Sequence, residues 1–318
     1  MSAESIPGAL RARDPAVARA QLRTILGRPR VALMPGVADA LSARLVEEAG
    51  FEVCYLSGAA VANAQFGVAD VGLVTATEMA EQTRRVVSAT ALPVLVDGDT
   101  GYGNPLNVMR TVADLERAGA AGVQLEDQTT PKRCGHFDGK EVITTEEMVQ
   151  KIRAARAART DDRFVIVART DAAATLGLDE ALRRARAYAA AGADLLFVEA
   201  PSSEEALRRV CAEVPSVPHL VNLVEGGATP ILSRQVLEEM GFRLILYANL
   251  LLRATTRAAQ RALVHLAKHG DSDAIQEDII SWVERQRLVD LPVIRALENE
   301  FVADAGIPSN GRVARQAR

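Results

Sequence analysis

Two aspartates separated by one residue, Asp97 and Asp99, stand in the glycine-rich stretch VDGDTGYG. In an extended segment, residues two apart point to the same side. Two carboxylates that face one crevice repel each other unless a cation joins them, and Glu126 in a later EDQ stretch could add a third. Oxygen-rich sets of this kind suit Mg²⁺ or Mn²⁺. The spacing favours a metal site, with helix-capping or salt-bridged aspartates as the alternative.

A second candidate stretch, PKRCGH, contains Lys132, Arg133 and Cys134. A structural zinc site would need four ligands at metal spacing, and the other two cysteines of the chain have no Cys or His partner near them in the sequence. The two cations would instead lower the pKa of Cys134 and favour its thiolate. Cys134 is therefore a candidate nucleophile or proton donor, and an inert loop thiol is the alternative.

Two further stretches could bind an anion. Backbone N–H groups of residues 57–59 in YLSGAA could cradle one, although an ordinary tight turn fits the same letters. Tyr55 lies two residues earlier and could face the same pocket as a proton carrier. Arg169 offers a planar fork for a carboxylate or a phosphate, or it is a structural partner of Asp171.

Eight short β-branched runs alternate with helical stretches along the chain. They span residues 30–36, 52–58, 93–99, 122–127, 164–170, 194–200, 219–225 and 242–248. Continuous apolar runs of this kind are typical of parallel strands buried on both faces. Four joints place a Gly between a helix and the next run, where it can end the helix. The pattern predicts a closed (β/α)8 barrel; an open doubly wound sheet is the alternative, although no GxGxxG follows the first run.

Polar residues gather at the C-terminal ends of six of these runs. The ends read YLSGAA, DGDTGYG, EDQ, RTD, EA and NLVEGG. In a (β/α)8 barrel the chemistry lies at that end of the strands. The sequence therefore predicts a functional rim there.

The composition, net charge and cysteine count of the chain exclude several classes of protein. Lys and Arg number 37 against 41 Asp and Glu, a net charge of −4, so the basic excess of a nucleic-acid-binding face is absent. The longest apolar run, LILYANLLL, is shorter than the roughly 18–20 residues of a bilayer span. Three cysteines make no disulfide framework. We expect a cytoplasmic protein with no nucleic-acid or membrane partner, and one domain over residues 1–318: a barrel at about 30–268, C-terminal helices at about 272–304 and a flexible tail at 306–318.

Six motifs together resemble the isocitrate lyase/phosphoenolpyruvate mutase superfamily, over about Pro35 to Ala303. They are YLSGAA, LVDGDTGYG, LEDQTTPKRCGH, VIVARTDA, FVEA and NLVEGGATP. The resemblance implies a Mg²⁺-dependent (β/α)8 barrel (Mn²⁺ is the other candidate ion) that handles 2-oxo acids and their enolates. It also implies a last helix swapped between subunits and a homotetramer built as a dimer of dimers.

The resemblance assigns roles by position. The metal site would use Asp97, supported by Asp99, Asp70 and Glu126. The substrate would contact Ser57, Gly58, Ala59, Arg169, Glu199, Asn222 and Thr229. The catalytic set would be Cys134, Tyr55, Lys132, Arg133 and His136, with residues 132–136 on a mobile gate.

The cysteine of KRCGH favours carbon–carbon lyases over phosphonate mutases. The resemblance then implies cleavage of a 2-hydroxy di- or tricarboxylate, of the 2-methylisocitrate or 2,3-dimethylmalate type, into a 2-oxo acid such as pyruvate and a carboxylate such as succinate or propionate. Cys134 would protonate the leaving carbanion and Tyr55 would take the hydroxyl proton. The alternatives on the same barrel are a carboxyphosphonoenolpyruvate or phosphoenolpyruvate mutase and an oxaloacetate hydrolase or decarboxylase.

Two positions depart from the pattern of related lyases. Ala228 stands where 2,3-dimethylmalate lyases have Lys, and Ala248 stands where many lyases have Pro and oxaloacetate hydrolases have Ser. The second position tunes substrate choice in the resemblance, so a small Ala248 could leave room for a bulkier C3 substituent. The exact malate or isocitrate stays open.

Overall fold

The structure is a computed structural model that describes Leu10 and residues 13–132 and 141–303. Its residues divide into two compact units, Arg13–Ala258 and a C-terminal unit that begins at Ala259. The expectation of one domain over residues 1–318 stays a prediction. The expected tail at 306–318 lies outside the described residues.

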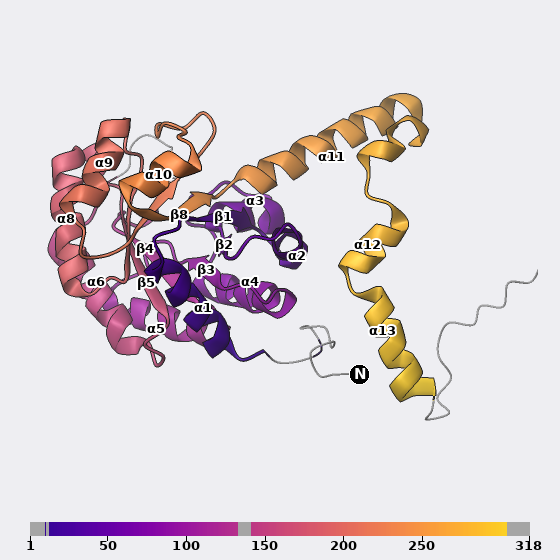
Figure 1. The fold of residues 1–318 in the computed structure, drawn as a ribbon, viewed down its shortest axis with the longest axis horizontal. Helices are drawn as coiled ribbons and strands as arrows, with labels where there is room; N and C mark the ends of the chain where they lie inside the picture. The colour runs from indigo at the N-terminus through magenta and orange to yellow at the C-terminus, as the bar shows by residue number, and fades with distance from the viewer. Residues whose placement is uncertain (1–9, 11–12, 133–140, 304–318) are drawn as a thin grey trace, which may run out of the picture. The chain divides into compact units, whose positions relative to one another are not determined.

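Eight parallel strands of the first unit close into a barrel in chain order (Figure 1). They are β1 (Ala32–Val37), β2 (Cys54–Leu56), β3 (Val94–Asp97), β4 (Gly122–Glu126), β5 (Val165–Thr170), β6 (Leu195–Val198), β7 (His219–Asn222) and β8 (Phe242–Tyr247). Strand β1 pairs with β8, with Ala32 opposite Leu244, so the sheet has no open edge there. The predicted (β/α)8 barrel is confirmed and the doubly wound sheet is wrong, because each of the eight apolar runs overlaps one strand of a closed sheet.

Helices surround the barrel (Figure 1). They are α1 (Pro15–Gly27), α2 (Ala40–Glu48), α3 (Gly58–Phe66), α4 (Ala76–Ala89), α5 (Pro105–Arg117), α6 (Thr145–Ala158), α7 (Ala172–Thr175), α8 (Leu178–Ala191), α9 (Glu204–Glu213) and α10 (Arg234–Met240). Helix α11 (Leu250–His269) follows β8 and continues into the C-terminal unit. Thr75 and Glu78 form a capping box that begins α4. Gly192 and Gly241 end α8 and α10 in the left-handed conformation, as the helix-to-strand joints predict.

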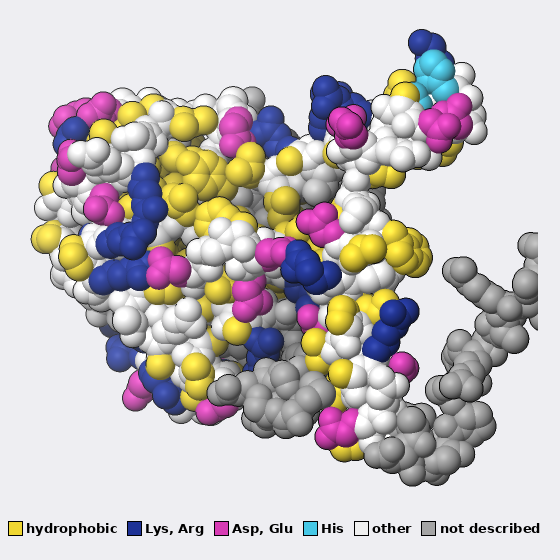
Figure 2. All heavy atoms as spheres, turned by 45° about the vertical axis from the view of Figure 1, so that its right-hand side comes forward, with side chains coloured by type: hydrophobic (Ala, Val, Ile, Leu, Met, Phe, Trp, Pro, Cys, Tyr) yellow, Lys and Arg dark blue, Asp and Glu magenta, His cyan; other side chains and the backbone are white. Residues whose placement is uncertain are grey.

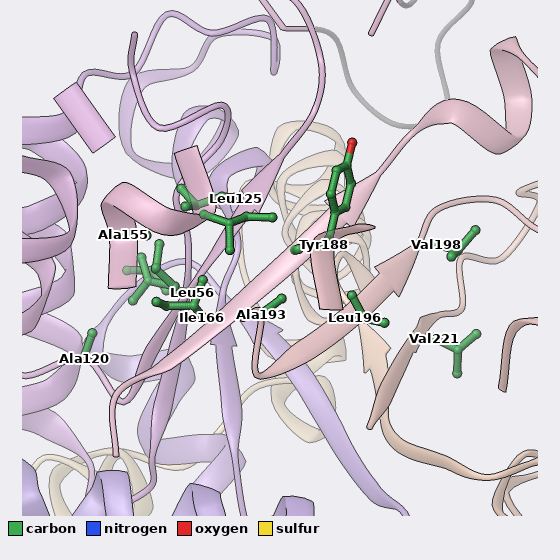
Figure 3. Packing of buried hydrophobic residues seen from close by; sticks show 14 of the residues in the cluster. Leu56, Ala120, Leu125, Ala155, Ile166, Tyr188, Ala193, Leu196, Val198 and Val221 are labelled. Atoms are coloured by element: carbon green, nitrogen blue, oxygen red, sulfur yellow. The ribbon is translucent and has the colours of Figure 1, made fainter. Parts of the chain in front are cut away.

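The strands are buried on both faces, which explains their continuous apolar sequences. Inside the barrel, Met34, Leu95 and Phe197 belong to one apolar cluster. Outside it, side chains such as Leu56 and Ile166 pack in a second cluster with the helices (Figure 3). Because side chains alternate along a strand, the inward positions continue to Asp97, Glu126 and Arg169 at the strand ends. The barrel interior thus changes from apolar to charged at its C-terminal end.

The C-terminal unit continues from the end of α11 through short helices. These are η3 (Asp273–Asp278), α12 (Trp282–Leu288), α13 (Leu291–Glu298) and η4 (Asn299–Ala303), in agreement with the helices expected at 272–304. Several of its large apolar side chains are exposed, among them Leu263, Val264, Trp282 and Val283. The swapped helix stays a prediction.

The surface mixes charges of both signs. Figure 2 shows Lys and Arg interspersed with Asp and Glu on the face that it draws. Within the described part of the chain, no helix combines the length and the apolar character that a membrane span requires.

Candidate active site

A cavity opens at the C-terminal ends of the barrel strands. Its lining residues are Tyr55, Ser57, Ala59, Asp70, Asp97, Glu126, Lys132, Arg169, Glu199, Asn222, Leu246, Ala248 and Asn249. Most of the residues expected to form the site are thus brought together, although they lie up to 167 positions apart (Tyr55 and Asn222). Their individual roles stay predictions.

The remaining expected residues divide into three groups. Gly58 and Asp99 lie just behind the lining: the Gly58 N–H donates to Asp97 Oδ2 at 3.1 Å, and Asp99 Oδ1 lies 3.0 Å from Lys132 Nζ. Thr229 is buried but does not line the cavity. The gate residues Arg133, Cys134 and His136 lie outside the described residues.

Residues 57–59 form the first turn of α3. Ser57 caps the helix, with its Oγ accepting the Ala60 N–H at 3.3 Å. A helix N-terminus favours an anion. The Gly58 N–H already binds the Asp97 carboxylate, so part of the predicted cradle holds an acidic side chain of the protein.

The acidic half of the cavity surrounds one ammonium group. Lys132 forms ion pairs with Asp70 and with Asp99. Burial alone would lower the pKa of Lys132, but Asp99 and the neighbouring carboxylates outweigh burial and raise that pKa. Burial also raises the pKa of Asp99, to about 7, against the lowering effect of Lys132. The cluster therefore carries more acidic groups than its one lysine compensates.

The oxygen atoms of this cluster suit a hard divalent cation. Buried Glu126 Oε1 has no hydrogen-bond partner, and burial raises the pKa of Glu126 well above its ordinary value. Among the described residues, no group of three His, Cys, Asp or Glu side chains is spaced to hold a metal directly. Mg²⁺ usually takes one or two carboxylates and completes its shell with water and substrate oxygens. Asp97, with Asp99, Asp70 and Glu126 around it, fits that mode of binding.

Arg169 provides the basic half of the cavity. Its Nε and Nη2 donate to Asp171 at 2.9 and 3.0 Å. The same guanidinium lies 3.4 Å from a carboxylate oxygen of Glu126 and 3.4 Å from one of Glu199. It also lies over the Phe197 ring, 5.2 Å from the centroid. Arg169 is thus a structural partner of Asp171 and also lines the cavity, and its role as a fork for an anion stays a prediction.

Tyr55 presents a protonated phenol to the cavity. Burial, followed by the charge of Asp97, raises the pKa of Tyr55 well above its ordinary value of 10. The cavity wall next to strands β7 and β8 is formed by Asn222, Asn249 and Ala248. Asn249 was missed from sequence, and its position directly after the eighth strand is the signal that could have found it.

The sequence matches the family "Phosphoenolpyruvate phosphomutase" over residues 22–267. It is 47% identical over 273 residues to "Probable 2-methylisocitrate lyase 2" of Corynebacterium glutamicum, covering 86% of each chain. It is 39% identical to "2,3-dimethylmalate lyase" of Eubacterium barkeri, covering 89% of this chain and 97% of the relative. It is also 43% identical to the chloroplastic carboxyvinyl-carboxyphosphonate phosphorylmutase of Arabidopsis thaliana, covering 93% and 88%.

Solved structures agree with these matches. An oxaloacetate acetylhydrolase with 3,3-difluorooxalacetate superposes with a TM-score of 0.86 at 33% identity, covering 93% of this chain and 100% of that one. A 2,3-dimethylmalate lyase gives 0.84 at 36% identity, covering 92% and 96%. A phosphonopyruvate hydrolase with oxalate and Mg²⁺ gives 0.82 at 30%, covering 90% and 99%. This chain therefore belongs to the phosphoenolpyruvate mutase/isocitrate lyase superfamily, and it is an enzyme of the carbon–carbon lyase branch.

Proposed function

We propose that the protein is a Mg²⁺-dependent lyase of a 2-hydroxy di- or tricarboxylate of the 2-methylisocitrate or 2,3-dimethylmalate type. The observation that carries the proposal is that one cavity is lined both by the Arg169 guanidinium and by the Asp97, Asp70 and Glu126 carboxylates. The carboxylate of a 2-hydroxy acid suits the guanidinium. Its hydroxyl suits a cation held by the acidic side chains.

The residues of this chain would bind and orient the substrate. Arg169 would take the carboxylate next to the reacting carbon, since a guanidinium fork matches a carboxylate in geometry and charge. The N-terminal turn of α3 at Ser57–Ala59 would lie against the same half of the substrate. When bound, Mg²⁺ would act as a Lewis acid toward the substrate oxygens. The acidic cluster of Asp97, Asp99, Asp70 and Glu126 would hold the cation there.

Cleavage breaks the carbon–carbon bond next to the hydroxyl carbon. The hydroxyl loses its proton, the hydroxyl carbon becomes the carbonyl of the 2-oxo acid, and the bond electrons leave on the other carbon. Tyr55 lines the cavity, and we propose that it receives the hydroxyl proton as a phenolate, so that its own proton leaves before the bond breaks. We propose Cys134 as the donor that protonates the departing carbanion, with Arg133 and His136 beside it in the sequence.

Two other reactions compete on this barrel. The likeness to an oxaloacetate acetylhydrolase, at a TM-score of 0.86, supports a hydrolase as the second candidate. A phosphonate mutase is the third, in line with the plant phosphorylmutase relative. Replacing Cys134 with Ser separates the lyase from the mutase: lyase turnover should be lost, whereas transfer of a phosphoryl group should be affected less.

We also propose a homotetramer in the cytoplasm. The exposed apolar side chains of the C-terminal unit, such as Trp282 and Val283, support burial against another subunit. Cys54 and Cys211 are buried free thiols, which suits a reducing compartment. Light scattering of the purified full chain measures the mass, and a monomeric mass would contradict the assembly.

The function is tested by oxo-acid release from a panel of substrates. The panel is isocitrate, 2-methylisocitrate, 2,3-dimethylmalate, citramalate and oxaloacetate, each with and without Mg²⁺. Release of pyruvate from a substituted malate or isocitrate is the expected result. Hydrolysis of oxaloacetate alone would favour the second candidate.

A further inference from the structure

A buried polar network lies behind Arg169, outside the cavity, and is centred on Asp127. Asp127 is fully buried and does not line the cavity. Its carboxylate accepts hydrogen bonds from the Thr170 hydroxyl (2.7 Å), the Asp171 N–H (2.9 Å), Arg184 Nη1 (3.0 Å) and the Tyr188 hydroxyl (2.7 Å). Four donors, of which Arg184 is charged, thus bind one buried carboxylate and hold it in one orientation.

The network holds the segment that carries Arg169. The N–H of Asp127 donates to the Arg169 carbonyl at 3.2 Å, and Asp127 Oδ1 accepts from the Asp171 N–H. The backbone from 169 to 171 is thus fixed to Asp127 at both ends. Asp171, itself fully buried, in turn takes two hydrogen bonds from the Arg169 side chain. The direction of the guanidinium therefore depends on Asp127 through Asp171.

Helix α8 supplies the outer end of the network. Arg184 and Tyr188 lie one turn apart on α8, and Arg184 is held by Glu180 on the preceding turn, with Nε 2.9 Å from its carboxylate. Figure 3 shows the Tyr188 ring beside aliphatic side chains of the outer layer, with its hydroxyl oxygen pointing away from them. A Phe at position 188 would fill the same space in the apolar layer. The hydroxyl of Tyr188 is explained by its hydrogen bond to Asp127.

We propose that Asp127, Tyr188 and Arg184 are positioning residues that fix the guanidinium of Arg169 for the carboxylate of the substrate. The inference rests on the proposed function in one respect, namely that Arg169 binds that carboxylate. Without a fixed Asp171, Arg169 has two other carboxylates to turn toward, Glu126 and Glu199, each 3.4 Å away. Either turn would withdraw donors from the ligand.

Two substitutions test the network with little change in packing. Tyr188→Phe removes one donor to Asp127 and keeps the ring. Thr170→Val removes another, and Thr170→Ser restores the hydroxyl. Tyr247→Phe is the matched control, because it removes a phenol hydroxyl from half-buried Tyr247 on β8, outside the network.

The readout is the dissociation constant of oxalate, a minimal dicarboxylate, measured by calorimetry with Mg²⁺ on the full chain, beside KM, kcat and Tm. Tyr188→Phe and Thr170→Val should each weaken oxalate binding about three- to tenfold, the effect of one ordinary hydrogen bond, because the lost bond acts on Arg169 only through Asp127 and Asp171. KM should rise more than kcat falls. Thr170→Ser and Tyr247→Phe should bind oxalate like the wild type.

The possible failures are distinguishable. Unchanged oxalate affinity in Tyr188→Phe and Thr170→Val, with only Tm lowered, would overturn the positioning role and leave a purely structural network. A wild-type protein that binds oxalate but cleaves no 2-hydroxy acid would contradict the proposed function alone. A wild-type protein that binds no oxalate would contradict Arg169 as the carboxylate anchor, and both proposals with it.

Discussion

Gly36 on β1 and Ala248 beyond the end of β8 approach so closely that a Cβ on Gly36 would lie 2.0 Å from the Ala248 carbonyl oxygen. Backbone on both sides leaves no flexible side chain that could move aside. Because Ala248 lines the cavity, the absence of a side chain at residue 36 sets where this wall of the cavity lies.

Gly36→Ala should therefore destabilise the protein and disturb the site together. We expect a loss of about 3 kcal/mol or more in the free energy of unfolding, at the upper end of overpacking effects. Denaturant titration measures it. Gly27→Ala is the matched control, because a Cβ there meets nothing within 4 Å. Equal stability of the two variants would contradict the close approach.

Lys132 forms ion pairs with two of the carboxylates that we expect to support the metal, Asp70 and Asp99. A divalent cation that binds Asp99 and its neighbours must displace or repel the ammonium, which lies 3.0 Å from Asp99 Oδ1. Lys132→Met should therefore tighten Mg²⁺ binding in the absence of substrate, on the order of tenfold, which corresponds to about 1.4 kcal/mol. Calorimetric titration with Mg²⁺ measures this affinity.

The control for charge is Lys268→Met on the exposed end of α11. This substitution also removes one lysine charge, but at a position far from Lys132 in the sequence, and it should leave the Mg²⁺ affinity at the wild-type value. Weaker Mg²⁺ binding by Lys132→Met would mean that the lysine supports the metal site instead of competing for it.

Ala248 should govern the size of the substituent that the substrate carries. Its small side chain lies next to Leu246 in the cavity wall, so a larger side chain would take up space from the substrate. Ala248→Pro should shift kcat/KM toward less substituted malates. Ala248→Gly should retain the wild-type kcat/KM for malates with bulkier substituents. Turnover of malates with substituents at C2 and C3 measures the preference, and an unchanged order in Ala248→Pro would count against this role.

His219 should make the fold sensitive to acid. It is buried on β7, with Nε2 2.8 Å from the Val214 carbonyl oxygen. Burial first, and the charge of Arg243 in addition, lower its pKa from the ordinary value of 6.5. Below pH 6.5 the unfolded chain binds a proton that the folded chain still excludes, so the free energy of unfolding falls as the pH falls toward the folded-state pKa.

The variant His219→Gln should remove this contribution. Its free energy of unfolding should fall less steeply below pH 6.5, by up to about 1.4 kcal/mol per pH unit for one proton, and match the wild-type slope above pH 7. Exposed His269→Gln is the control and should retain the wild-type slope. Parallel curves for wild type and His219→Gln would show that His219 titrates alike in both states.

The strands were predictable because burial on both faces of a strand requires a continuous run of apolar residues. The run VIVART, for example, is apolar up to Arg169, where the strand reaches the rim. Asp97, Glu126 and Arg169 were candidates for the same reason, since parallel strand ends converge on one edge.

Contacts made by loops and by helix faces were not predictable from pattern. Asp70 came from family resemblance, and its ion pair with Lys132 joins two loops 62 residues apart. Arg184 and Tyr188 look like ordinary positions of the amphipathic helix α8, and only the fold shows that both donate to Asp127. The approach of Gly36 to Ala248 depends on barrel closure, which no local sequence feature encodes.

The central claim is a cation-dependent cleavage of a substituted 2-hydroxy acid at the Asp97 and Arg169 cavity. The most direct measurement is release of the 2-oxo acid from 2-methylisocitrate and 2,3-dimethylmalate by the purified full chain, with Mg²⁺, with a chelator, and with Mg²⁺ restored. We expect release with Mg²⁺, its loss with the chelator, its return on restoration, and none from Asp97→Ala. Release that continues undiminished in the chelator or in Asp97→Ala, or no release from any 2-hydroxy acid, would contradict the account.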